Sequence, residues 1–296
     1  MQDDVQVGAE AEKDERHRSS YARGILLTIA YDGEQFSGLA VQGTIRTVGG
    51  ELQKAILAMD PNAGRIRVCS RTDKGVHARQ QYVVFDTNKD IGMRGWLLGL
   101  CGHLPREITV HRAARVDPGF RVSKRAIQKT YRYLILQGTL RDPFLEGRAW
   151  RVSERLNHEN MRRAAKFLEG THDFRAFRGS SDSRSNTVRT IHTVTVEPLS
   201  EQPRVLAITV TGTAFLFNMV RIICGTLVDI GRENRDPSAI RRAIRSGDRL
   251  DLGMTAPAAG LYLERIDLAE GGTDEWPYHL DGEPRVPKSV EPRAVD

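Results

Sequence analysis

The succession of strand-like and helix-like segments restricts the fold of this chain more strongly than its composition does. Between residues 24 and 116, apolar runs rich in β-branched residues alternate with two segments of helical periodicity. Strands are predicted at 24–31, 65–70, 82–86 and 108–116, and helices after Thr47 and at 93–103. The order strand, helix, strand, strand, helix, strand is that of a split βαβ unit, with an antiparallel sheet and helices on one face.

The second half of the sequence loosely repeats this order. Strands are predicted at 129–137, 188–196, 205–212 and 261–268, and helices at 157–168, 216–231 and 237–246. We therefore predict an α+β fold of two related split-βαβ (RRM/ferredoxin-like) halves that share a mostly antiparallel central sheet, with helices on its outer face. The predicted organisation is a disordered acidic tail (1–22), an N-terminal half (23–117), a C-terminal half (118–268) and a flexible proline-containing tail (269–296).

The charge of the chain is concentrated in its central part. The net charge is +6, but the first 20 residues carry −3 and the last 28 carry −4, which leaves +13 for residues 21–268. A basic body with acidic ends indicates a polyanionic partner, and nucleic acid fits best. The alternative is an ordinary solvated surface with no such partner.

Several classes of protein are disfavoured by what the sequence lacks. It has no apolar run near the ~20 residues that cross a bilayer and no apolar signal segment, so we expect a cytoplasmic protein without a membrane partner. Three scattered cysteines fit neither a disulfide framework nor a zinc site. With no phosphate-binding loop, dinucleotide fingerprint or metal-ligand spacing, we expect no metal and no cofactor.

The stretch from Cys69 to Arg79 is the first candidate for a functional site. It joins two predicted strands at what should be a sheet edge, and Asp73 is its only carboxylate among Arg71, Lys74, His77 and Arg79. Nearby positive charges should lower the pKa of Asp73 and keep it ionised, which suits a nucleophile or an electrostatic stabiliser. The alternative is plain hairpin chemistry, with Gly75 supplying a positive φ.

The predicted helix 216–231 is the second candidate. It is apolar on nearly all sides and should be buried, yet Arg221 lies in its middle. A buried guanidinium requires a partner, and Asp73 is a better candidate than the distant Asp229. The alternatives are that Arg221 extends to the surface or binds backbone carbonyls.

Aromatic and basic residues alternate on the strand 129–137. Tyr131 and Tyr133 share one face of this strand, and Arg132 points to the other. Tyrosine beside basic residues suits stacking on a nucleic-acid base, although half-buried strand aromatics would show the same pattern.

Several of these residues belong to blocks that resemble the TruA family of tRNA pseudouridine synthases. The resemblance extends from about Ile25 to Leu268, with the blocks in the family's order. Besides the Asp73 loop and the Lys129–Tyr133 strand, they include Tyr31-Asp32-Gly33, Thr47-Val48, Asp173-Phe174, Val188-Arg189-Thr190-Ile191, Met219-Val220-Arg221 with Gly225, and Gly260-Leu261-Tyr262-Leu263.

The resemblance implies an isomerase that converts uridine to pseudouridine in the anticodon stem-loop of tRNA (family target positions 38–40), as a homodimer without cofactor. It implies that Asp73 is the catalytic nucleophile, that Tyr131 stacks on the target base and that Arg221 pairs with Asp73. The residues expected to bind substrate are Arg71, Lys74, His77, Arg79, Leu263, Arg125 and Arg189.

Four positions depart from the family pattern: Ser70 replaces a glycine, Leu39-Ala40 replaces Trp-Gln, and Ser123 replaces an arginine. Two other functions are weighed against the isomerase. A non-catalytic RNA-binding or RNA-folding protein would not need Asp73, Tyr131 and Arg221 together. A hydrolase acting on nucleosides or sugars would need a second carboxylate as its proton donor.

Overall fold

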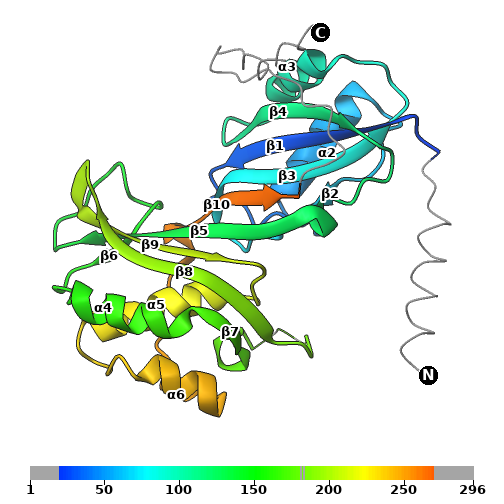
Figure 1. Ribbon diagram of the computed structural model, residues 1–296. Coiled ribbons are helices and arrows are strands. Elements are labelled where there is room, and N and C mark those ends of the chain that lie inside the picture. Colours follow the sequence, from blue (N-terminus) through cyan, green and yellow to red (C-terminus); the bar gives the residue numbers. More distant parts are fainter. Residues whose placement is uncertain (1–19, 181, 183, 270–296) are drawn as a thin grey trace, which may run out of the picture.

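The fold is given by a computed structural model that describes residues 20–180, 182 and 184–269 (Figure 1). The predicted acidic tail (1–22) and proline-containing tail (269–296) lie almost entirely outside these residues. In the described part of the chain, no helix is long and apolar enough to span a membrane.

The core of the molecule is a single sheet of ten strands. The strands are β1 Arg23–Tyr31, β2 Arg67–Val68, β3 His77–Thr87, β4 Ile108–Val116, β5 Ala126–Gln137, β6 Trp150–Val152, β7 Gly170–Asp173, β8 Val188–Leu199, β9 Gln202–Gly212 and β10 Leu261–Leu268. Eight of them follow the order β4-β1-β3-β10-β5-β9-β8-β7, while β2 pairs with β3 and β6 with β5. Only the β3–β10 and β5–β6 pairs are parallel. The predicted α+β fold with a mostly antiparallel shared sheet is confirmed.

The helices also follow the sequence pattern. They are α2 Val48–Met59, α3 Met93–His103, α4 His158–Ala165, α5 Met219–Gly231 and α6 Ala239–Ser246. In α2, the Gly50 amide donates to Thr47 Oγ1 (3.1 Å), which is the N-cap expected from the sequence. Helix α5 begins three residues later than predicted, because Asn218 has a left-handed backbone (φ 61°) that a right-handed helix cannot contain.

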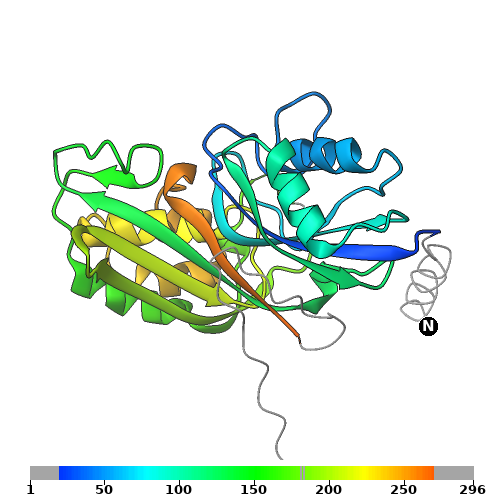
Figure 2. The same cartoon turned by 90° about the horizontal axis from the view of Figure 1, so that it is seen from above.

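Strand β10 joins the two parts of the sheet. It lies between β3 and β5, and Figure 2 shows it running between the two lobes. Leu263 is in register with Ala78 on β3 and with Tyr131 on β5. The Asp73 loop therefore leads into an interior strand. The prediction that it lies at a sheet edge is wrong, because strand β10 comes from the other end of the sequence.

Close packing of helix α5 against the segment before β10 depends on Gly225. A Cβ atom at this position would lie 1.8 Å from the carbonyl oxygen of Met254. That segment is also bound to α5 by the Ala256 amide, which donates to the Arg221 carbonyl (3.1 Å). The glycine thus lets the chain that leads into β10 lie directly on the helix that carries Arg221.

Replacing Gly225 by Ala should lower the free energy of unfolding by about 1–3 kcal/mol or more, because backbone must move to make room for the methyl group. Thermal or urea unfolding measures this loss. Gly102→Ala is the matched control, since a Cβ there meets nothing within 4 Å and alanine is the better helix former. Equal stability of the two variants would contradict the proposed packing role.

Candidate active site

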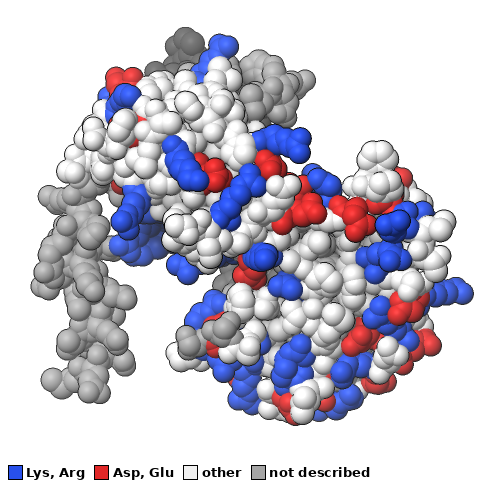
Figure 3. Space-filling model, turned by 180° about the vertical axis from the view of Figure 1, so that it is seen from behind, with Lys and Arg blue, Asp and Glu red and all other residues white. Residues whose placement is uncertain are grey.

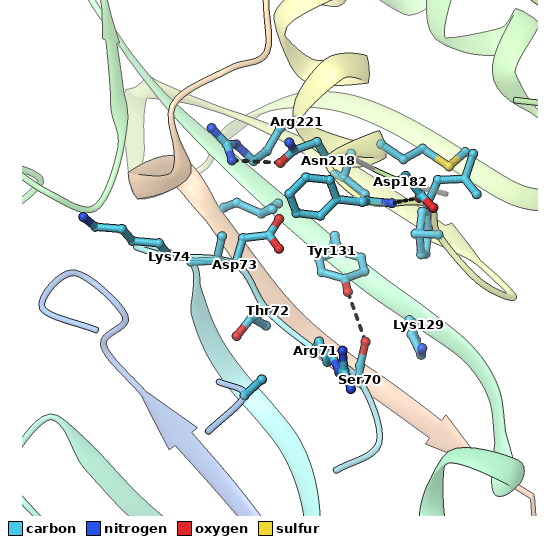
Figure 4. Close-up of a pocket in the computed structure, with 18 of the residues that line it drawn as sticks. Ser70, Arg71, Thr72, Asp73, Lys74, Lys129, Tyr131, Asp182, Asn218 and Arg221 are labelled. Atoms are coloured by element: carbon cyan, nitrogen blue, oxygen red, sulfur yellow. Dashed lines mark hydrogen bonds between the residues drawn. The ribbon is translucent and has the colours of Figure 1, made fainter. Parts of the chain in front are cut away.

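A cavity of about 1060 Å³ lies where the Asp73 loop, strand β5 and the start of helix α5 meet. Its volume is at the upper end of the range for small-molecule sites, about 300–1,000 Å³. Asp73, Tyr131 and Arg221 all line it (Figure 4). In the space-filling view of Figure 3 a hollow separates the two lobes, with lysine and arginine side chains on both of its sides. Three segments far apart in the sequence therefore meet at one site.

Asp73 lies in a tight turn. The Val76 amide donates to the Asp73 carbonyl (3.1 Å), and Gly75 has a φ of 77°. A second loop packs against this turn through Gly38, where a Cβ atom would lie 2.7 Å from the Thr72 carbonyl oxygen. The turn chemistry expected from the sequence is therefore present. It fixes the backbone and leaves the Asp73 side chain on the cavity wall.

The electrostatics of Asp73 differ from the prediction. Burial raises the pKa of its carboxyl group above the usual value, and the positive charge of Arg221 offsets this only in part. Within the described part of the chain the carboxylate has no hydrogen-bond or ion-pair partner. The expectation that its neighbouring cations lower the pKa is wrong, because those side chains point elsewhere; Lys74 extends away from it in Figure 4.

Arg221 is held by neutral partners. Its Nε donates to the carbonyl oxygen of Ala256 (2.7 Å), and its NH1 donates to Oδ1 of Asn218 (2.9 Å). No ion pair joins Arg221 to Asp73 among the residues that the structure describes. The backbone-carbonyl alternative weighed for this guanidinium is the one observed, while its charge still acts on Asp73 across the cavity.

Asn218 is a site residue that sequence reasoning missed. Its left-handed backbone is one of two positive-φ conformations found at non-glycine residues in the described chain. Such a conformation costs of order 1–3 kcal/mol, although asparagine tolerates it better than most residues. Here it turns the side chain toward Arg221. The available signal was an asparagine three residues before a core arginine, at the expected start of the helix.

Tyr131 forms the central wall of the cavity. It is 7% exposed, and the ring of Phe215 meets its ring edge-on, with centroids 5.1 Å apart. Burial raises the pKa of its phenol to about 12, so the hydroxyl stays protonated at neutral pH. Ser70, which replaces the family's glycine, places its Oγ 3.5 Å from this hydroxyl. Leu263 is fully buried beside Tyr131 on the neighbouring strand.

Two predicted substrate-binding residues lie on the opposite face of the sheet. His77 is in register with Tyr262, which is in register with Arg132, and these three residues point away from the side of Tyr131. His77 is 2% exposed, and its Nε2 lies 3.0 Å from the Ala259 carbonyl oxygen. Arg79 lies over the Tyr262 ring. The assignment of His77 to the substrate site is therefore corrected, because this side chain is packed behind the cavity. Arg79 lies on the same face as His77, outside the cavity lining, and 63% of its side chain is exposed.

The other predicted binding residues are distributed around the cavity. Arg71 and Lys74 line it, whereas Arg125 and Arg189 are outside its lining among the residues described. Arg125 lies over the ring of Phe120 (5.9 Å). Of the positions that depart from the family pattern, Ala40 lines the cavity and Leu39 is fully buried behind it.

Asp182 and Arg184 were not singled out as a pair by the sequence, and both line the cavity. Arg184 donates to both oxygens of Asp182, from Nε at 2.9 Å and NH2 at 2.7 Å. The Phe217 amide also donates to the Asp182 carboxylate (2.9 Å), and these bonds hold its pKa well below the usual value. Asp182 is thus fully occupied, and Asp73 is the carboxylate of this cavity that remains available. In the described ranges no three His, Cys, Asp or Glu side chains are placed to hold a metal ion.

Comparison with known proteins identifies the family of this chain. A family model described as tRNA pseudouridine synthase matches residues 164–267. The chain is 41% identical over 241 residues to tRNA pseudouridine synthase A of Bacillus subtilis, covering 81% of this chain and 96% of that protein. The chain belongs to the tRNA pseudouridine synthase A family. Its identity to the Staphylococcus epidermidis member is 36% over 245 residues, which covers 83% of this chain and 91% of that protein.

The unpaired carboxylate of Asp73 leads to a prediction about stability. A carboxyl group whose pKa is raised by folding binds its proton more tightly in the folded state. The fold therefore loses stability as the pH rises from the unfolded value, about 3.9, through the raised folded value, and the penalty persists above it.

We therefore expect Asp73→Asn to be more stable than the native chain at about pH 7, with the difference shrinking as the pH falls through that window. Urea unfolding over a pH series measures it. Asp117→Asn, at an exposed position, is the control and should show no such gain. A destabilised Asp73→Asn variant at neutral pH would contradict this account of the carboxylate.

Proposed function

We propose that this protein isomerises uridine to pseudouridine in tRNA. Two observations support the proposal: the family to which the chain belongs, and one available carboxylate, Asp73, beside an aromatic wall in a cavity of nucleotide size. The second observation, the carboxylate beside the aromatic wall, is the one that supports the proposed reaction. The reaction needs a group that can attack or stabilise, and a surface on which a base can lie.

In the proposed reaction Asp73 is the nucleophile. The bond between uracil N1 and ribose C1′ breaks, the base turns, and C5 forms a new bond to C1′. The C5 hydrogen leaves as a proton and N1 gains one, so the reaction is a net isomerisation. Whether Asp73 attacks the base or the sugar, the C5 hydrogen is lost to solvent in both routes.

We propose that the other cavity residues prepare this step. Arg221 stabilises the ionised form of Asp73 through its charge, acting at longer range than an ion pair. Tyr131 stacks on the base, since its raised pKa makes it a poor proton carrier. Leu263 backs the pocket beside Tyr131.

Access to the base requires that the uridine leave its stack, at a cost of a few kcal/mol. We propose that Arg71 and Lys74 on the cavity wall assist this base flipping, and that Arg125 and Arg189, which are not among the lining residues, contact the RNA backbone. On the family resemblance we further propose that the target lies in the anticodon stem-loop and that the protein works as a homodimer in the cytoplasm, without cofactor. Light scattering tests the dimer.

Tritium release from tRNA labelled at uracil C5 tests the proposed activity directly. The native chain should release tritium from unmodified tRNA, and Asp73→Asn should lose activity by roughly a thousandfold or more because the nucleophile is gone. Asp117→Asn should stay fully active. A native chain that binds tRNA without releasing tritium would reject the isomerase in favour of a non-catalytic RNA-binding protein.

The pH dependence of kcat/KM tests the role of Arg221. Activity requires ionised Asp73, so it should fall as the pH drops through the pKa of this carboxyl group, which burial places above the usual value. Removing the charge in Arg221→Leu should raise that pKa further and move the acid limb to higher pH. Arg221→Lys keeps the charge and should leave the limb near its native position. Identical profiles in all three proteins would refute this charge effect.

A further inference from the structure

A group of positive charges lies on the cavity side away from Asp73, around strands β5 and β8. We call Lys129, Arg184 and Arg189 the β5–β8 cation cluster; the first two line the cavity, and Arg189 lies at the start of β8. Burial lowers the pKa of Lys129, and the positive charge of Arg184 lowers it further. The same two causes, in the same order, lower the pKa of Arg189. Arg184 is therefore close enough to repel both Lys129 and Arg189.

Two members of the cluster, Lys129 and Arg189, lack an ion-pair partner among the described residues, and the negative charge of Asp182 offsets only part of the lowering of the pKa of Arg189. Asp182 is committed to Arg184 and to the Phe217 amide, with its side chain only 2% exposed. Lys129 and Arg189 make no ion pair within the described part of the chain. The thiol of Cys69, beside Lys129, is neutral at ordinary pH because burial raises its pKa.

The donors of the cluster are also incompletely used. The Nε of Arg189 is buried without an acceptor, while its NH1 donates to the carbonyl oxygen of Val188 (2.6 Å). For Lys129, the described residues provide no hydrogen-bond acceptor. A buried unpaired donor is costly, and repelling cations add to that cost, so the cluster is suited to an anion from outside the chain.

The position of the cluster fixes which anion fits. Lys129 is two residues from Tyr131 on the same face of β5, and both line the cavity, so their Cα atoms are about 7 Å apart along the strand. Figure 4 shows Tyr131 between Asp73 on one side and Lys129 and Asp182 on the other. The sugar of uridine is attached at N1, in the bond that breaks, so a uridine stacked on Tyr131 brings its sugar into the same cavity. The phosphodiesters on that sugar are then the anions nearest to Lys129.

We infer that the β5–β8 cation cluster is a phosphate subsite, which binds a phosphodiester next to the extruded uridine; this inference rests on the proposed function. Lys129 is its central residue, with Arg184 and Arg189 completing it. Binding there neutralises the repelling charges and supplies acceptors for the unused donors. The subsite thus holds a phosphodiester of the target nucleotide while Asp73 acts at its base or its sugar.

A thermodynamic cycle on tRNA tests the inference. The target uridine is mapped with the native chain, and two tRNAs are then assembled with a neutral methylphosphonate in place of the phosphate on its 5′ or its 3′ side. Their affinities, and that of unaltered tRNA, are measured at fixed salt with Asp73→Asn protein, with and without Lys129→Gln. Lys129→Arg and Arg189→Gln are measured in the same background.

For one of the two linkages, we expect neutralisation to weaken binding about tenfold in the Asp73→Asn protein, and Lys129→Gln alone to cost about the same with unaltered tRNA. Combined, the two changes should cost little more than either alone, because they remove the same contact. Lys129→Arg should retain most of the affinity. Lys129→Gln should also reduce the slope of log K against log salt by about 0.7, the loss of one backbone contact to a single strand.

Arg245→Gln on helix α6 is the matched control, since it removes one exposed positive charge outside the cavity. Its effect should multiply with that of either methylphosphonate. Multiplying effects for Lys129→Gln at both linkages would overturn the subsite. Absence of tritium release by the native chain would overturn the proposed function, and this inference with it, so the two failures are distinguishable.

Discussion

The backbone pairing of β10 with β3 on one side and β5 on the other determines the geometry of the site. Its hydrogen bonds align Ala78, Leu263 and Tyr131 in adjacent rows of one sheet. The turn that carries Asp73 comes directly before β3, and Tyr131 lies on β5, so this alignment sets the distance between carboxylate and aromatic wall. The same strand also positions helix α5, because the chain that enters β10 packs on Gly225 of this helix. The candidate site is therefore a consequence of strand order.

The cavity contains charges that the protein does not neutralise itself. Burial raises the pKa of Asp73, and its ionised form is stabilised only by the charge of Arg221, whose guanidinium is hydrogen-bonded to other groups. Lys129 is desolvated and has no ion-pair partner in the described chain. Each arrangement works against stability, whereas Asp182, in the same cavity, has every bond it needs. The contrast separates a carboxylate that is held by the structure from one that is available to a ligand. An available carboxylate and an unpaired cation, on two sides of one aromatic ring, suit a ligand that presents an uncharged group to Asp73 and an anion to Lys129.

The sequence was sufficient to predict the helices and most of the strands, though not the short strands β6 and β7, and to bring Asp73, Tyr131 and Arg221 to one place. Periodicity and capping are local properties, and the family pattern supplied the long-range pairing. What sequence reasoning missed depends on geometry that local pattern does not contain. His77 and Arg79 follow the turn of Asp73 directly in sequence, and they were therefore predicted to bind substrate with it. The register of β3 with β10 places them on the other face of the sheet. The direction of the Arg221 guanidinium follows from the backbone of Asn218, and the pKa of Asp73 follows from burial rather than from its neighbours in sequence.

The position of β10 in the chain has a consequence for biosynthesis. Strands β3 and β5 both precede it by more than a hundred residues, so each has an open edge while the intervening segments are being made. Contacts of such long sequence separation form late and slow the overall rate of folding. A nascent chain that already contains the turn of Asp73 and the strand of Tyr131 still lacks the strand that lies between β3 and β5 and aligns them. The candidate site is therefore complete only after β10 has been made and has paired with both strands.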